Sequence, residues 1–173
     1  MDRISMTPAE RWGSVARGAT AGLVAGTVFA AAEMAASSLG GYGPSFAARM
    51  AASIWLGPHA FTESIGTVFL IGAVLHYAIA MGWGIAGSVL YEWAEWPTRN
   101  DLGVAHSVSL GALFGMVVWV ADMAVVAGNF LPWIWRAHQP SQFLLHALFF
   151  GVPLGVTVAA LYRLAPQPAL RSS

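Results

Sequence analysis

The stretch IGTVFLIGAVLHYAIAMGWGIAGSVLY, residues 65–91, contains no Asp, Glu, Lys or Arg. A helix rises about 1.5 Å per residue, so about 20 apolar residues cross a hydrocarbon core about 30 Å thick. A barrel strand needs only about ten residues, and their polarity alternates, which it does not do here. The stretch therefore predicts a transmembrane α-helix.

Three further stretches of similar length and character lie on either side of it, at residues 18–39, 102–127 and 143–162. Glu33 is the one charged residue of the first stretch and Asp122 that of the third. A secretory signal is the alternative for the first stretch, but Glu33 interrupts the region that a signal keeps apolar. We therefore predict an all-α, four-span protein that forms one domain over residues 1–173.

The composition supports a membrane protein, since 57% of the residues are hydrophobic and 9% are charged. A soluble domain has about 45–50% apolar and about 25% charged residues. The chain has no Cys, which excludes disulfides and thiolate chemistry, and its zero net charge gives no basic surface for nucleic acid. It contains no Ser–His–Asp order, phosphate-binding loop or HExxH motif, so we expect no enzyme.

Orientation follows from the arginines, because the chain has no Lys. Arg49 and Arg136 lie in the first and third connections, and the other six of the eight basic residues lie in the two tails and the second connection. Cytoplasmic segments are enriched in Arg, so both termini are expected in the cytoplasm, with the protein in a bacterial inner membrane. The two outer connections, residues 40–64 and 129–142, are expected to cover the bundle or contact a partner, and residues 46–56 to form an amphipathic helix.

The spans also predict an internal repeat of two helical hairpins. An offset of 89 residues aligns Gly22 with Gly111, and an offset of 71 aligns Gly84 with Gly155. His76 aligns with His146 only after a one-residue slip. Rows of small residues four positions apart allow membrane helices to approach closely, and they predict that the helices pack through Gly18, Gly22, Gly26, Gly84, Gly111, Gly115, Gly151 and Gly155.

Four ionisable residues lie well inside the spans: Glu33, His76, Asp122 and His146. Each costs about 2.5–3.5 kcal/mol to insert if it is charged, so such residues face the bundle interior and find partners. Glu33 lies on the glycine face of its helix at 100° per residue, and Asp122 does the same. All four are predicted to converge in the outer half of the membrane.

Several kinds of site are compatible with these four residues. All four could ligate one metal ion, although no Glu-x-x-His pair is present. His76 and His146 could clasp a haem. A proton relay or a pocket for a quinone head group uses the same residues. The simplest alternative is hydrogen bonding between helices, in which Glu33 and Asp122 each accept from a His or a Trp. The sequence does not identify a cofactor.

The segments RGATAGLVAGT (17–27), LHYAIAMGWGIAGSVLY (75–91) and LHALFFGVPLG (145–155) resemble the uncharacterised bacterial four-helix inner-membrane proteins of the YagU-like kind. The resemblance implies topology and no established activity. Because neither the tails nor the connections are large enough to form a domain, the function we expect is that of an accessory subunit within a larger membrane assembly, such as a respiratory or photosynthetic complex. Its expected partners are lipid and other subunits. The competing hypothesis is the cofactor- or ion-handling bundle described above.

Overall fold

The computed structural model describes residues 8–95 and 104–164, and this part of the chain is all-α, as predicted. Residues 102 and 103 of the predicted third span lie outside the described residues. The elements are α1 (Pro8–Leu39), α2 (Ser45–Leu56), η1 (Gly57–Phe61), α3 (Ile65–Glu95), α4 (Val104–Trp119), η2 (Val120–Ala127), α5 (Gly128–Phe130), α6 (Pro132–Trp135), α7 (Gln139–Leu144), η3 (Leu145–Gly151) and α8 (Val152–Leu164).

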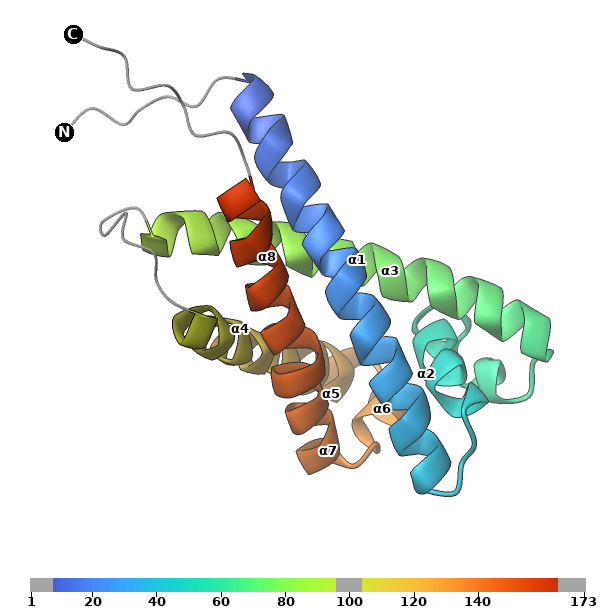
Figure 1. Ribbon diagram of the computed structural model, residues 1–173. Helices are drawn as coiled ribbons and strands as arrows, with labels where there is room; N and C mark the ends of the chain where they lie inside the picture. The colour runs from blue at the N-terminus through green and yellow to red at the C-terminus, as the bar shows by residue number, and fades with distance from the viewer. Residues whose placement is uncertain (1–7, 96–103, 165–173) are drawn as a thin grey trace, which may run out of the picture.

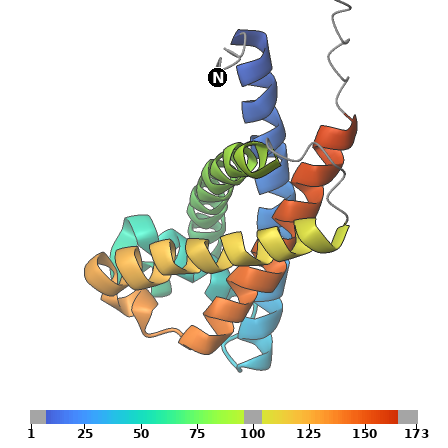
Figure 2. The same cartoon turned by 90° about the vertical axis from the view of Figure 1, so that its left-hand side faces the viewer.

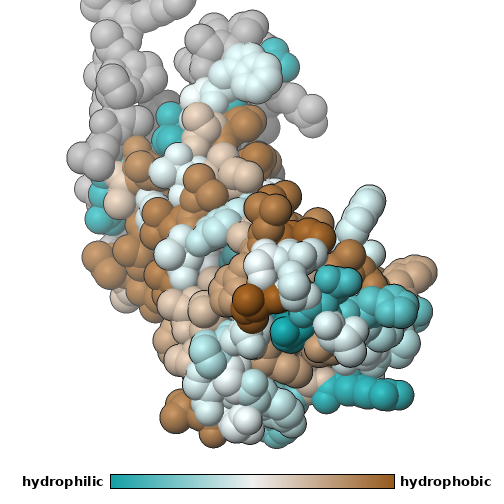
Figure 3. Space-filling model, turned by 90° about the vertical axis from the view of Figure 1, so that its right-hand side faces the viewer, coloured by the Kyte–Doolittle hydropathy of each residue, from teal (hydrophilic) through white to brown (hydrophobic). Residues whose placement is uncertain are grey.

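Four helical stretches are long and apolar enough to cross a membrane, and they indicate a multi-pass membrane protein. The first and second are α1 and α3. The third runs from α4 through η2 into α5, and the fourth from α7 through η3 into α8. Figure 3 shows a face on which brown, hydrophobic and pale residues cover most of the surface, with a group of teal, hydrophilic residues toward the lower right. So much exposed apolar surface suits a protein that contacts lipid.

The spans form two crossed hairpins. α1 crosses in front of α3 in Figure 1, and α4 crosses the η3–α8 helix in Figure 2. α1 also packs along η3 and α8, which joins the hairpins in the order α3, α1, α8, α4. Within the described ranges, α3 and α4 share no comparable interface. The structure therefore leaves a crevice between α3 and α4.

Each hairpin is held by backbones that nearly touch. A Cβ atom placed on Gly84 would lie 2.6 Å from the Cα of Gly22, and one on Gly155 would lie 2.9 Å from the Cα of Gly111. These two contacts join positions that the predicted repeat makes equivalent; the repeat itself stays a prediction. All eight glycines assigned to packing are buried in such interfaces: Gly18, Gly22, Gly26, Gly84, Gly111, Gly115, Gly151 and Gly155.

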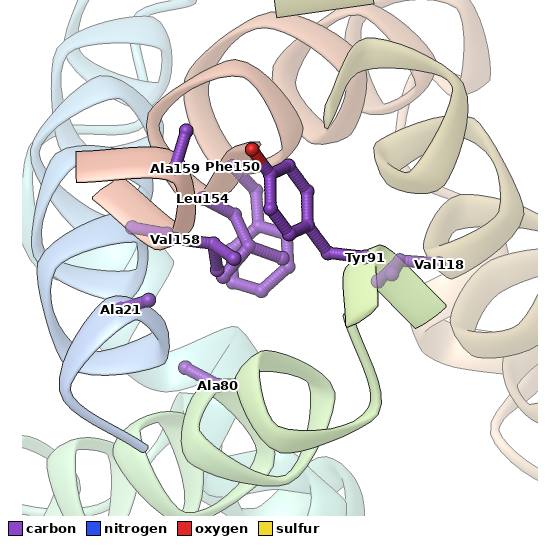
Figure 4. Close-up of a cluster of buried hydrophobic side chains, with 9 residues drawn as sticks. Ala21, Ala80, Tyr91, Val118, Phe150, Leu154, Val158 and Ala159 are labelled. Atoms are coloured by element: carbon purple, nitrogen blue, oxygen red, sulfur yellow. The ribbon is translucent and has the colours of Figure 1, made fainter. Parts of the chain in front are cut away.

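The main core lies where α1, α3 and α8 meet. Figure 4 shows Ala21 of α1, Ala80 of α3 and Leu154 of α8 directed toward one another. Nearer the first residues of α1, which we call the terminal end, the hydroxyl of Tyr162 lies 3.0 Å from the Oγ atoms of both Ser14 and Ser88. One α8 side chain thereby joins α1 and α3 by hydrogen bonds.

The opposite end, which we call the loop end, carries the two connections. The predicted helix over residues 46–56 is confirmed as α2, which packs on α3. α6 lies in the other connection, and Trp133 of α6 donates its indole N–H to the Oγ of Ser53 of α2 at 3.1 Å. Met50 of α2 also packs against a buried cluster that contains Ile134 of α6. The two connections therefore contact each other and not only the spans.

The third and fourth spans each contain a π-helical segment, η2 and η3. The backbone N–H of Gly128 bonds to the carbonyl of Met123, and that of Val152 to the carbonyl of Ala147, each five residues back. A π turn holds one residue more than an α turn does. The predicted repeat requires one extra residue between His146 and Gly155, and the π-helical segment η3 lies at that position.

Candidate functional site

The crevice between α3 and α4 widens toward the loop end into a cavity of about 420 Å³. Its walls come from α1, α2, α3, η2 and η3, and they are mostly apolar. All four ionisable residues that the sequence predicted to converge line this one cavity: Glu33, His76, Asp122 and His146. The glycine interfaces determine this arrangement, because they orient α1 and α3 so that Glu33 and His76 face η2 and η3.

Both histidines have one ring nitrogen fixed by a backbone carbonyl. His76 donates from Nε2 to the carbonyl of Gly26 at 2.8 Å, and His146 donates from Nδ1 to the carbonyl of Gln142 at 2.7 Å. Phe29 contacts both imidazole rings, with ring centroids 6.0 Å from His76 and 4.7 Å from His146. Each neutral ring keeps its second nitrogen as an acceptor: Nδ1 in His76 and Nε2 in His146.

The two acids have different surroundings. Trp83 donates its indole N–H to both carboxylate oxygens of Asp122, at 3.2 and 3.1 Å, across the crevice from α3 to η2. The simplest of the alternatives, an acid bonded by a Trp or a His, thus describes Asp122. Glu33 is different. Its side chain forms a hydrogen bond with Gln142, but its Oε1 atom is buried without a hydrogen-bond partner.

This geometry bears on the metal and haem hypotheses. Among the described residues, no three His, Asp or Glu side chains are placed so that they could hold one metal ion. A haem with two axial histidines needs one ring nitrogen of each histidine directed at the iron. The Nε2 of His76 is instead engaged with Gly26, and the Phe29 ring lies against both imidazoles. Neither site is assembled in this conformation.

The cavity reaches the surface of the protein on the side of the spans. Phe69 of α3 and Val126 of η2 both line it, and they are 40% and 43% exposed. At the loop end, residues of α2 and of the α6 connection line it, and the Ser53–Trp133 hydrogen bond joins these two segments; Ile54 of α2, also in the lining, is 40% exposed. These exposed lining residues are apolar and lie on α2, α3 and η2, so the opening faces the surroundings of these helices.

Sequence reasoning missed three residues of the site: Phe29, Gln142 and the bonding role of Trp83. Spacing could have indicated them, because residues four or seven apart share a helix face. Phe29 lies four residues before Glu33, Gln142 four before His146, and Trp83 seven after His76.

Comparison of this chain with protein-family models, with curated proteins and with solved structures finds no match. The resemblance to YagU-like proteins therefore stays a prediction, and the function has to be argued from the cavity itself.

Proposed function

We propose that this protein binds a small lipophilic molecule that enters the cavity from the bilayer. One observation carries the proposal: a mostly apolar cavity of about 420 Å³ opens beside Phe69 and Val126 and has polar groups along its inner wall. Ligand sites are typically concave and apolar, with a few placed polar groups that orient the ligand. The volume falls in the ordinary range for such sites, about 300–1,000 Å³.

The site would lie in the outer half of a bacterial inner membrane, with both termini in the cytoplasm. The arginine distribution supports this orientation, which puts the loop end outside. The quinone pocket suggested by the sequence is one case of the proposed function. The proton relay is supported less directly, because a relay needs a continuous chain of groups and Phe29 lies against both imidazoles.

The proposal can be tested with decylubiquinone, an uncharged lipophilic probe, on protein purified into phosphatidylcholine nanodiscs. Trp83 lines the cavity, so bound quinone should quench Trp fluorescence in a saturable way. Ala73→Phe fills the cavity and should weaken binding by about tenfold or more. Ala78→Phe adds the same bulk to the exposed face of the same helix and should bind as the original chain does. Saturable quenching that Ala73→Phe leaves unchanged would contradict the proposal, and so would the failure of every lipophilic probe to bind saturably.

A second function, accessory subunit of a larger membrane assembly, is supported by a different observation. The glycines predicted to pack helices are used within the chain, but Ala78, Gly82 and Ala86 form another row of small residues on the exposed face of α3. Nothing lies within 4 Å of a Cβ placed on Gly82. A helix of another subunit could approach this row closely.

Co-purification in a mild detergent tests the second function. Gly82→Leu should remove any chain that accompanies the tagged protein, because the added side chain keeps the helices apart. Gly66→Leu is the matched control, since Gly66 on α3 is equally open and lies outside the row. A protein that purifies alone in native membranes, without any companion, would count against the subunit function.

A further inference from the structure

We propose that the molecule bound in this cavity is a lipophilic organic cation, such as a protonated hydrophobic amine or a quaternary onium compound. The inference rests on the proposed function and deepens it by naming the ligand class. It is argued from the charges, the hydrogen-bonding groups and the aromatic rings that line the cavity.

The charged groups along the wall are acidic. Glu33 and Asp122 line the cavity, and its lining includes no Arg; the chain contains no Lys. Arg49, in the nearby loop-end connection, is engaged elsewhere, since it donates to the carbonyls of Ala60 and Glu63 at 2.8 and 2.9 Å. A buried carboxylate without a cationic partner is costly, so a ligand that brings a positive charge would offset that cost.

Glu33 marks the position for that charge. Its Oε1 atom is buried without a hydrogen-bond partner, in a residue that lines the cavity. Buried polar atoms of native proteins are nearly always partnered, and an exception requires an explanation such as an unfilled ligand position. A cationic group beside Glu33 would pair with this oxygen by charge, and a protonated amine would also donate the missing hydrogen bond.

The hydrogen-bonding groups of the wall favour the same class of ligand. The polar hydrogens of the wall are largely engaged: the Trp83 indole bonds to Asp122, the Tyr77 hydroxyl lies 3.2 Å from the Oγ1 atom of Thr27, and both imidazoles donate to carbonyls. The atoms left over include Glu33 Oε1 and, in the neutral rings, the second nitrogens of His76 and His146, which are acceptors; the Gln142 amide, which bonds to Glu33, keeps a second N–H. A protonated amine donates to such acceptors and a quaternary onium ion needs no donor from the wall, whereas a quinone or an anion does need donors.

Aromatic rings complete the site. Phe29, Tyr77, Trp83 and Phe150 all line the cavity. The negative face of an aromatic ring attracts an organic cation, and the attraction strengthens when both are removed from water. The apolar remainder of the ligand would lie toward the opening at Phe69 and Val126, where the cavity meets the lipid-facing surface.

Two ions of nearly the same size and shape, tetraphenylphosphonium and tetraphenylborate, isolate the effect of charge. We expect the purified chain, in phosphatidylcholine nanodiscs, to bind the phosphonium about tenfold or more tightly than the borate, measured by equilibrium dialysis against empty nanodiscs. Equal binding of the two ions, or tighter binding of the borate, would overturn the inference. This comparison uses the unmodified chain and does not depend on a variant that folds.

The second experiment removes the charge of an acidic side chain without changing its size. Glu33→Gln should weaken phosphonium binding by about tenfold or more, because a buried charge partner is lost. Glu63→Gln, an exposed acid outside the cavity, should change nothing, and Asp122→Asn repeats the test if Glu33→Gln fails to fold. Unchanged phosphonium binding by folded Glu33→Gln, checked by circular dichroism, would overturn the inference. If decylubiquinone binds without a preference for the phosphonium, this inference fails alone; if no probe binds, the proposed function fails as well.

Discussion

At the scale of single residues, the polar groups of the cavity depend on contacts between helices: Trp83 of α3 bonds to Asp122 of η2, and Phe29 of α1 contacts both histidines. Glu33 and Asp122 were placed by helical periodicity on the glycine faces of their spans, and both line the cavity. Periodicity gives a direction around one helix. It does not give the crossing geometry of two helices, which determines that Trp83 reaches Asp122 and that Phe29 lies between the two histidines.

The glycine contacts lead to a prediction of stability. Gly84→Ala should lower the free energy of unfolding by about 1–3 kcal/mol, because its Cβ would overlap the backbone of α1 around Gly22. Gly82→Ala, two residues away in an open position, should be neutral or slightly stabilising, since Ala favours a helix by up to about 1 kcal/mol over Gly. Reversible unfolding in mixed micelles measures both. Equal effects at the two positions would show that the close approach of α1 and α3 is not stabilising.

At the scale of elements, the lengths of the spans and the existence of α2 could be predicted, because both depend on local composition. The π-helical segments could not be predicted, although the one-residue slip in the alignment of the second and fourth spans pointed to an extra residue in one of them. The predicted repeat implies one extra residue between His146 and Gly155, and η3 contains a π turn at that position. Such segments are frequent at functional sites, and here His146 lies within η3 and lines the cavity.

This account of η3 predicts the outcome of deletions. Removing Leu148, an exposed residue of η3, should convert the segment to regular α-helix and leave α8 in register. Removing Val156, an exposed residue of α8, should rotate all that follows by about 100° and displace Tyr162 from Ser14 and Ser88. We therefore expect a monodisperse, thermally stable protein only from the first deletion, judged by size-exclusion chromatography and thermal melting. The reverse order of tolerance would contradict this account.

At the scale of the whole molecule, the all-α class and the four spans followed from 57% hydrophobic and 9% charged residues. The order of the helices in space did not follow. A repeat of two hairpins is compatible with a closed bundle or an open one, because both use the same small-residue rows. Only the packing of α1 along η3 and α8, which has no counterpart between α3 and α4, leaves the crevice that becomes the cavity.

Orientation in the membrane can be tested with single cysteines, since the chain has none of its own. His59→Cys at the loop end and His106→Cys at the terminal end are both exposed positions. A thiol reagent that does not cross membranes should label His59→Cys in intact cells, and His106→Cys only after the cells are permeabilised. Labelling of His106→Cys in intact cells would reverse the proposed orientation.

The hydrogen bond between Ser53 and Trp133, which joins the two loop-end connections beside the cavity, has a consequence for any binding measurement. A cavity closed toward water and open toward lipid exchanges its contents with the lipid phase. Its occupancy is then set by the mole fraction of ligand dissolved in the membrane, which is the aqueous concentration multiplied by a partition coefficient. Apparent dissociation constants expressed as total ligand per litre should therefore rise as lipid is added at constant protein, whereas those expressed as ligand per mole of lipid should stay constant.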